Sequence, residues 1–208
     1  MKHFGDITKL NGAELPVVDV ITGGSPCQNL SVAGNREGLA GEQSQLFLEQ
    51  IRIVKEMRAN DRANGRTGYM VRPRYMVWEN VPGALSSPGK GHTGEDFQTV
   101  LTEIVKIVYP ECPDVPLPPK GKWPKSGCLM GIGEDGSAFS VAYRVHDSQF
   151  WGVAQRRKRI CLIADFGGIS AGEILFEREG LCWDLEESGV QGQTVTANFE
   201  GSVGESNS

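Results

Sequence analysis

The chain has little histidine and no paired cysteines. Its 208 residues include three histidines and five cysteines, and no two cysteines form a C-x-x-C pair. A structural zinc site is therefore not expected, and the scattered, odd number of thiols favours a reducing, cytoplasmic compartment. Long hydrophobic runs are also missing. No segment of about 18 apolar residues predicts a membrane span, and residues 1–10 lack the apolar core of a secretory signal.

Acidic residues outnumber basic ones, but the two signs are separated along the chain. The net charge is −5, yet residues 165–208 hold nine acids and one base, and residues 1–164 carry a charge of +3. Within the first part, residues 52–74 hold seven bases against two acids. A basic body with an acidic tail is compatible with a phosphate-binding face, so the overall charge does not exclude nucleic acid as a partner.

Apolar periodicity predicts one α/β unit followed by a tail. Helical stripes at residues 44–59 and 97–109 alternate with strand-like segments at residues 17–22, 75–78, 139–145 and 159–164. The first strand is expected to be buried, the last two strands to be antiparallel, and the proline-rich residues 112–124 to form a surface loop. The periodicity fades after Gly167, and residues 191–208 are expected to be disordered.

A cysteine follows the first predicted strand in a turn rich in glycine and proline. The segment Gly23-Gly24-Ser25-Pro26-Cys27-Gln28 begins where the apolar run ends, and Pro26 restricts the backbone on the approach to Cys27. Open α/β sheets hold their chemistry at the ends of strands. The thiol could be structural, redox-active or nucleophilic. A nucleophile needs a lowered pKa and partial exposure, which the glycines and nearby backbone N–H groups would favour.

A carboxylate follows the second predicted strand, in the segment Val77-Trp78-Glu79-Asn80-Val81-Pro82. A helix that connects two parallel strands places their carboxyl ends side by side. We therefore expect Glu79 and Cys27 within the width of one substrate, as a proton donor and a nucleophile. The alternative is that Glu79 caps a nearby loop amide.

Four cations in succession, residues 156–159, lead into the last predicted strand. Strand alternation would place Gln155, Arg157 and Arg159 on one side, with Arg156 and Lys158 on the other. Beside a nucleophile, two arginines on one face are suited to clamp a phosphate and a polar base edge. Alternatively, the run is a solvated strand whose charges prevent edge pairing.

In this order, the three segments resemble motifs IV, VI and VIII of the DNA (cytosine-5)-methyltransferase family. The matching residues are Gly-Gly-Ser-Pro-Cys-Gln-Asn-Leu-Ser from position 23, Glu-Asn-Val from 79 and Gln-x-Arg-x-Arg from 155. Gly5-Asp6-Ile7 is similar to motif III and Leu46-Phe47 to motif V. The resemblance runs from about residue 4 to residue 166, and the segments 118–128 and 147–160 are similar to phage or prophage members.

The resemblance implies a partial Rossmann-like, S-adenosylmethionine-dependent methyltransferase fold of the α/β class. Residues 1–166 would form the catalytic domain, and residues 167–208 an acidic, glycine- and serine-rich tail with little order. The implied enzyme transfers a methyl group from S-adenosylmethionine to C5 of a flipped cytosine in double-stranded DNA. Its implied setting is restriction–modification in the cytoplasm of a bacterial or phage-infected cell, without a metal.

The family's motifs also imply a role for each matching residue. Cys27 would attack C6 of cytosine, Glu79 would hold N3 and the exocyclic amine, and Arg159 would bind O2. Arg157 would support the nucleophile loop or a phosphate. Residues 29–41 would close over DNA as a lid. Contacts to the cofactor are implied for Asp6, Pro26 and Leu46, and contacts to DNA for Gln28, Ser31, Asn80 and Gln155.

The resemblance begins at motif III and stops after motif VIII. It implies a fold without the first strands, the glycine loop of motif I, the acidic residue of motif II, the target-recognition domain and motifs IX and X. Such a fragment is expected to expose apolar surface. It could be catalytic, alone or completed by a second polypeptide that supplies motif I and the target-recognition domain. It could also be an inactive remnant that binds DNA or a partner. A thiol redox protein is disfavoured because no second cysteine lies near Cys27.

Overall fold

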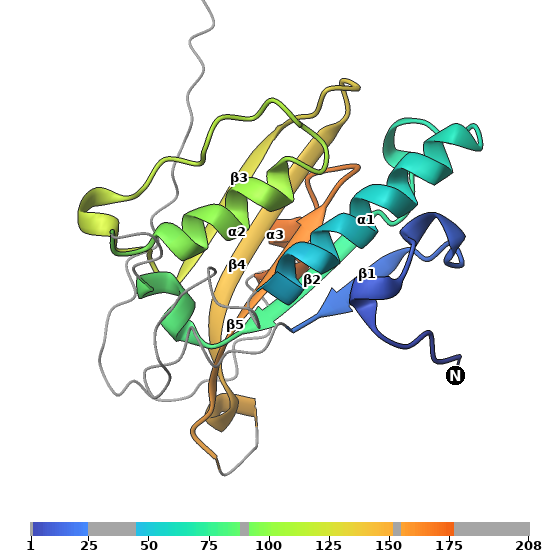
Figure 1. Cartoon of the computed structure of the whole chain (residues 1–208). Coiled ribbons are helices and arrows are strands. Elements are labelled where there is room, and N and C mark those ends of the chain that lie inside the picture. The colour runs from blue at the N-terminus through green and yellow to red at the C-terminus, as the bar shows by residue number, and fades with distance from the viewer. Residues whose placement is uncertain (1, 25–44, 88–91, 152–154, 177–208) are drawn as a thin grey trace, which may run out of the picture.

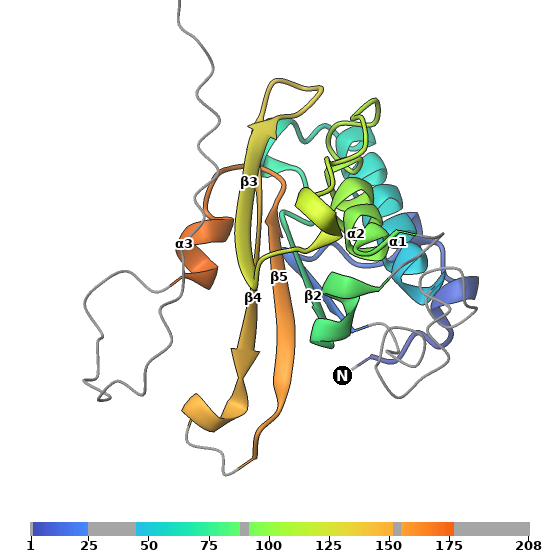
Figure 2. The ribbon, with the colours of Figure 1, turned by 90° about the vertical axis from the view of Figure 1, so that its left-hand side faces the viewer.

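A mixed five-stranded sheet with helices on both faces forms the fold (Figure 1). The computed structural model describes residues 2–24, 45–87, 92–151 and 155–176. Helices α1 (Gln45–Ala63) and α2 (Glu95–Val105) cover one face, and the short helix α3 (Ala171–Leu175) packs on the other (Figure 2). The strand order is β1 (Val20–Gly23), β2 (Tyr75–Asn80), β5 (Lys158–Asp165), β4 (Ala138–Asp147) and β3 (Ser126–Ile132). The predicted α/β class is confirmed.

The predicted parallel unit β1–α1–β2 is confirmed. β1 pairs with β2 in parallel, from Val20 opposite Tyr75 to Gly23 opposite Trp78. Helix α1 makes the connection and ends at Ala63, beyond the end that was predicted at residue 59. Because both strands point the same way, the ends of β1 and β2 meet at one edge of the sheet.

The prediction of a buried first strand was wrong. The strand covers Val20–Gly23 rather than residues 17–22, and Val17 and Val20 are 55% and 47% exposed. β1 lies at the end of the sheet and, among the described strands, pairs with β2 alone. An apolar β-branched run is typical of a strand with neighbours on both sides, but here one side of β1 has no described partner. The expected exposed apolar surface is therefore present at this edge.

Aromatic rings from both helices and two strands form the centre of the core. The Phe47 ring meets Trp78 edge-on with centroids 5.7 Å apart, and Phe97 meets Tyr143 in the same way at 4.8 Å. All four residues are buried. Such pairs add roughly 0.5–1.5 kcal/mol each beyond the burial of their area. This packing fixes α1 and α2 against the strands that carry the candidate site.

The second half of the sheet is antiparallel. β5 pairs antiparallel with both β2 and β4, so the expectation for the last two strands is confirmed. Both strands are longer than predicted, whereas the second helix, predicted over residues 97–109, ends at Val105. The predicted surface loop at residues 112–124 contains only the 3-10 helix η6 (Pro119–Gly121). None of the helices in the described ranges is long and apolar enough to cross a membrane.

The edge strand β3 had no counterpart among the predicted strands. Its segment contains Gly127 and Gly131, which in sequence favour a loop. A Cβ atom at Gly127 would lie 2.7 Å from the Tyr143 ring, and one at Gly131 would lie 2.8 Å from the Phe139 ring. The glycines therefore make room for rings of the neighbouring strand β4. Local propensity could not predict this strand, because its glycines are explained by contacts with side chains of another strand.

Candidate active site

Two of the predicted catalytic side chains form an ion pair. Glu79 Oε1 lies 2.8 Å from Arg159 Nε, and both side chains remain partly exposed. Glu79 was expected in a loop, but it is part of β2, because β2 stays paired with β5 up to Asn80 opposite Ile160. The register places Glu79 opposite Cys161. Arg159 lies two residues before Cys161 on the same strand, so it is a diagonal neighbour of Glu79 and its long side chain reaches the carboxylate. The pair is thus fixed by the pairing of two strands far apart in sequence.

The chain enters the predicted nucleophile segment directly beside Glu79. A Cβ atom at Gly24 would lie only 3.2 Å from Glu79 Oε2. Gly24 immediately follows β1 and is the last described residue before position 45. Pro26, Cys27, Gln28, Ser31 and the predicted lid at residues 29–41 lie outside the described residues. Their roles stay predictions, and the position of Gly24 supports the predicted proximity of Cys27 and Glu79.

Asn80 shapes the turn that leaves β2. Its side chain is buried, and its Oδ1 accepts a hydrogen bond of 2.8 Å from the backbone N–H of Val81. Asparagine commonly stabilises turns by bonding to nearby backbone in this way. The geometry supports a positioning role for Asn80 next to Glu79, and the predicted contact to DNA stays a prediction.

Only part of the basic run belongs to β5. The strand begins at Lys158, so Gln155 and Arg157 precede it. Both residues are exposed, and the predicted clamp of two arginines on one face stays a prediction. Of the two predicted catalytic arginines, Arg159 alone meets Glu79 among the described contacts.

Ser148 closes the base of the turn between β4 and β5. Its backbone N–H donates to the carbonyl of Arg157 at 3.1 Å, and its Oγ accepts from the backbone N–H of Arg157 at 3.1 Å. Ser148 Oγ also donates to the carbonyl of Gln155. The backbone at Gln155 and Arg157 is therefore held by one residue that the sequence motifs do not identify.

A small pocket lies between β1, the N-terminal segment and α1. Its volume is about 230 Å³. The predicted cofactor residue Leu46 lines it, together with Ile7, which follows Asp6. The complete lining is Ile7, Ile21, Thr22, Gly23, Gly24, Leu46, Gln50 and Ile53. Gln50 was not predicted as a site residue, and its signal in the sequence is its position one helical turn after Leu46.

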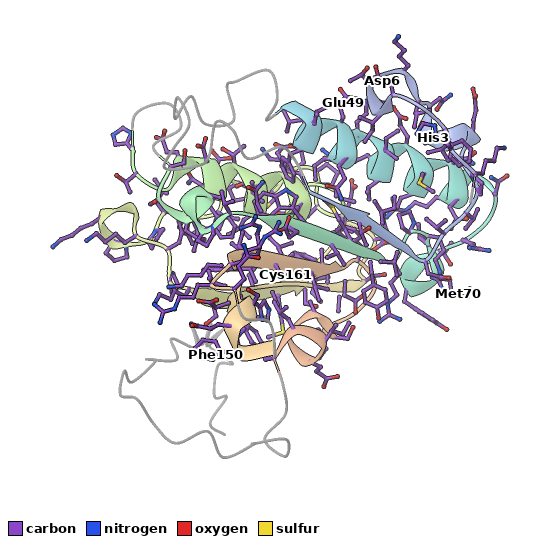
Figure 3. The ribbon with its side chains drawn as sticks, turned by 90° about the horizontal axis from the view of Figure 1, so that it is seen from below. His3, Asp6, Glu49, Met70, Phe150 and Cys161 are labelled. Carbon is purple, nitrogen blue, oxygen red and sulfur yellow. The ribbon has the colours of Figure 1, made fainter. Side chains whose placement is uncertain are left out.

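The N-terminal segment is tied to α1 by Arg52 and Glu56. Arg52 donates to the carbonyls of Ile7 and Leu10, each at 2.9 Å, and Glu56 Oε2 accepts from the backbone N–H of Gly12 at 2.6 Å. These contacts hold Ile7 against the pocket. Asp6 lies on the same side of the sheet as α1 (Figure 3).

Asp6 caps the short 3-10 helix η1 (Ile7–Lys9). Its Oδ1 accepts from the backbone N–H of Thr8 at 3.0 Å and from the Thr8 hydroxyl at 2.9 Å. The backbone hydrogen bond, followed by the one from the hydroxyl, lowers the pKa of Asp6 below its usual range. The carboxylate is therefore ionised at neutral pH and exposed beside the pocket, where it can accept a hydrogen bond from an amine.

None of the thiols in the described part of the chain is activated. Burial raises the pKa of Cys112, Cys128 and Cys161, and the charge of Glu79 raises that of Cys161 further. These three cysteines stay protonated at neutral pH and are poor nucleophiles. Cys161 is only partly buried and lies within the sheet (Figure 3). No cluster of His, Cys, Asp or Glu that could hold a metal ion occurs within the described ranges.

The chain is similar to proteins that carry methyltransferase names. The chain is 33% identical over 200 residues to a protein of Escherichia phage P1 named DNA N-6-adenine-methyltransferase, covering 86% of this chain and 24% of the phage protein. It is 27% identical over 177 residues to the type II methyltransferase M.BsuFI of Bacillus subtilis, covering 85% of this chain and 32% of that enzyme. The chain thus spans about a quarter to a third of these two relatives.

The family assignment rests on a family profile, and a solved structure also aligns with the chain. The crystal structure of the Schizosaccharomyces pombe Dnmt2 methyltransferase aligns with 89% of this chain and 44% of its own, at a TM-score of 0.38 and 16% identity. The family profile described as C-5 cytosine-specific DNA methylase matches residues 1–115, which is more than half of the chain. The chain therefore belongs to the C-5 cytosine-specific DNA methylase family.

Proposed function

We propose that this chain carries the base-modifying part of a DNA (cytosine-5)-methyltransferase. The observation that carries the proposal is the Glu79–Arg159 ion pair beside Gly24, at the entry to the segment that contains Cys27. A carboxylate and a guanidinium side by side offer an acceptor for the exocyclic amine of cytosine and a donor for its O2. The target base must leave the helical stack to reach them.

The proposed chemistry begins with a covalent bond to the base. The Cys27 thiolate adds to C6 of cytosine, and Glu79 helps to protonate N3 and so offsets the charge that develops. C5 becomes enamine-like and takes a methyl group, which S-adenosylmethionine would supply when bound, leaving as S-adenosylhomocysteine. Return of the N3 proton to Glu79, loss of the C5 proton to a base and expulsion of the thiolate from C6 then restore the aromatic ring. Arg159 keeps O2 in place and Arg157 supports a phosphate or the nucleophile loop.

The pocket at α1 fits part of the methyl donor. Ile7, Ile21 and Leu46 form apolar walls suited to a flat ring, and the ionised Asp6 carboxylate is available to an exocyclic amine such as that of adenine. The volume of about 230 Å³ is smaller than the roughly 300–1,000 Å³ of typical ligand pockets. The described residues therefore fit the adenine end of the cofactor, whereas Pro26, also predicted to contact it, lies outside them.

Replacing Leu46 with alanine is expected to weaken binding of S-adenosylmethionine by about five- to tenfold, because the variant loses part of the apolar wall worth about 1–1.5 kcal/mol. Isothermal titration calorimetry of the full chain would measure this change. Leu48→Ala is the matched control, since Leu48 lies on the same helix, is 40% exposed and does not line the pocket. An equal loss in both variants would assign the effect to helix stability.

We propose that the exposed edge of β1 is where a second polypeptide with the remaining methyltransferase motifs binds. Val17 and Val20 are exposed there, and β1 has no described neighbour on its outer side. An open apolar edge pairs readily with another strand. We propose that double-stranded DNA is the substrate and that a second polypeptide with motif I and a target-recognition domain completes the enzyme. The alternative is an inactive remnant that binds DNA or a partner through its basic face.

A methyl-transfer assay separates these functions. The full chain is incubated with duplex DNA and labelled S-adenosylmethionine, alone and with the product of the adjoining coding sequence, and the nucleosides are separated. We expect the label in 5-methylcytosine. Label in N6-methyladenine would contradict the proposal and agree instead with the name of the phage P1 relative. Unlabelled DNA in both mixtures would favour the inactive remnant.

A further inference from the structure

An exposed aromatic ring stands at the end of the β4–β5 hairpin. Phe150 is 69% exposed and belongs to the 3-10 helix η7 (Ser148–Trp151). The hairpin extends beyond the other strands of the sheet (Figure 1). We call the described residues 148–151 and 155–158 the hairpin tip. An exposed ring by itself is common on protein surfaces, and what distinguishes Phe150 is the charged residues around it and its distance from the proposed base-binding pair.

Three cations accompany the ring. Arg156, Arg157 and Lys158 are exposed, and none of their side chains forms an ion pair with a described residue. Arg159, the next residue, is instead neutralised by Glu79. The hairpin tip therefore presents uncompensated positive charge directly beside an apolar ring. Nucleic acid attracts such cations through its phosphates.

Local hydrogen bonds hold the ring in its exposed position. Besides the bonds of Ser148 to both sides of the turn, the buried Asp147 accepts from the backbone N–H of Gln149 at 3.3 Å and from its Nε2 at 3.0 Å. These contacts fix the two residues that precede Phe150. Its exposure thus follows from a bonded local structure.

The hairpin tip lies close to the proposed base-binding pair. Lys158 is opposite Asp147 and Arg159 is opposite His146, and Arg159 contacts Glu79. At about 3.3 Å per residue, Arg157 is roughly 7 Å along the chain from Arg159. One strand of B-DNA advances about 3.4 Å per nucleotide. Arg157 is therefore about two nucleotide steps from a cytosine held between Glu79 and Arg159, and Phe150 lies farther along the flanking duplex.

We infer that the hairpin tip docks on the duplex that flanks the target cytosine. Arg156 and Lys158 contact phosphates, and Phe150, which lies farther along the hairpin than Arg157, packs against a sugar or a base step of the flanking duplex. Apolar side chains inserted at base steps are a known means of distorting duplex DNA. This inference rests on the proposed function, because the flipped cytosine sets the register of the contact.

Replacing Phe150 with alanine tests the inference through binding alone. The affinity of the full chain for a fluorescent 25-base-pair duplex with one mispaired cytosine is measured by anisotropy at several salt concentrations, without cofactor. We expect Phe150→Ala to weaken binding about tenfold at every salt concentration, from lost apolar contact. Phe150→Leu should recover most of the affinity. Arg156→Gln should reduce the slope of affinity against salt by about one.

Tyr69→Ala is the matched control, because Tyr69 is 62% exposed but lies in the separate 3-10 helix η4 (Gly68–Met70). We expect its affinity to equal that of the unmodified chain. The inference fails if Phe150→Ala binds as tightly as the unmodified chain, if both alanine variants lose the same affinity, or if the unmodified chain does not bind the duplex. The binding assay tests this inference alone. Failure of the proposed function would appear separately, as the absence of 5-methylcytosine in the methyl-transfer assay. Circular dichroism of each variant checks that it is folded.

Discussion

Covalent capture of the chain on DNA that contains 5-fluorocytosine is expected to disappear in Cys27→Ser and to fall about 10²- to 10⁴-fold in rate in Glu79→Gln. Fluorine at C5 blocks the elimination that releases the thiolate, so the bond between Cys27 and C6 persists. Glutamine cannot pass a proton to N3, and it removes the carboxylate that forms the 2.8 Å ion pair with Arg159. The reaction contains labelled DNA, S-adenosylmethionine and any second polypeptide that methyl transfer requires. Denaturing gel electrophoresis then measures the captured fraction of the DNA over time.

Two controls make this result specific. Cys161→Ser should leave capture unchanged, because the Cys161 thiol faces Glu79 but burial and that carboxylate keep its pKa raised. Glu111→Gln removes an exposed carboxylate that forms no ion pair with a described residue, and it should also have no effect. Capture that survives Cys27→Ser and disappears in Cys161→Ser would reverse the assignment of the nucleophile.

Replacing Asp165 with asparagine is expected to lower the free energy of unfolding by about 3–5 kcal/mol, because it leaves a partly buried arginine without its counter-charge. The Asp165 side chain is fully buried and binds Arg74 through both oxygens, at 2.8 and 2.9 Å. It also accepts from the backbone N–H of Gly167 and from the Ser170 hydroxyl. Asp165 thereby joins the start of β2, the end of β5 and the approach to α3. Urea denaturation of the full chain measures the loss.

The loss of unfolding free energy caused by Asp165→Asn should become smaller at acidic pH. Burial by itself raises the pKa of Asp165, but the hydrogen bonds from Arg74, Ser170 and Gly167 together outweigh it and lower the pKa below its ordinary value. A carboxyl group whose pKa is lower in the folded state stabilises the fold fully above its unfolded pKa of about 3.9. That contribution is lost as pH falls through the lower folded pKa. The difference between the two proteins should therefore stay constant from about pH 5 to 8 and shrink below about pH 4.

Asp114→Asn is the control for this second prediction. Asp114 is 74% exposed and lies 3.7 Å from Lys106, so its ion pair is screened by water. Such surface pairs contribute about 0–1 kcal/mol, and the variant should unfold close to the unmodified chain at every pH. A loss for Asp165→Asn no larger than for Asp114→Asn would contradict the assigned role of the buried pair.

Much of the site could be predicted because its parts are local. The turn after β1 and the carboxylate after Trp78 follow short apolar runs, and the arginine of β5 directly precedes one, and such runs identify strands. The parallel pairing of β1 with β2 also follows from the helix between them. The extent of β2 does not, since Glu79 is in the strand only because β5 pairs with it.

The sequence by itself determined the family, the order of the chemical segments and the β1–α1–β2 unit, because these depend on residue types at short spacing. The tertiary structure decided which arginine meets Glu79, that β1 lies at an open edge, and that the glycines of β3 accommodate rings from β4. These features depend on strand register and on contacts between residues distant in sequence. A shift of one residue in register reverses the face of every side chain, and local propensity carries no information on that choice.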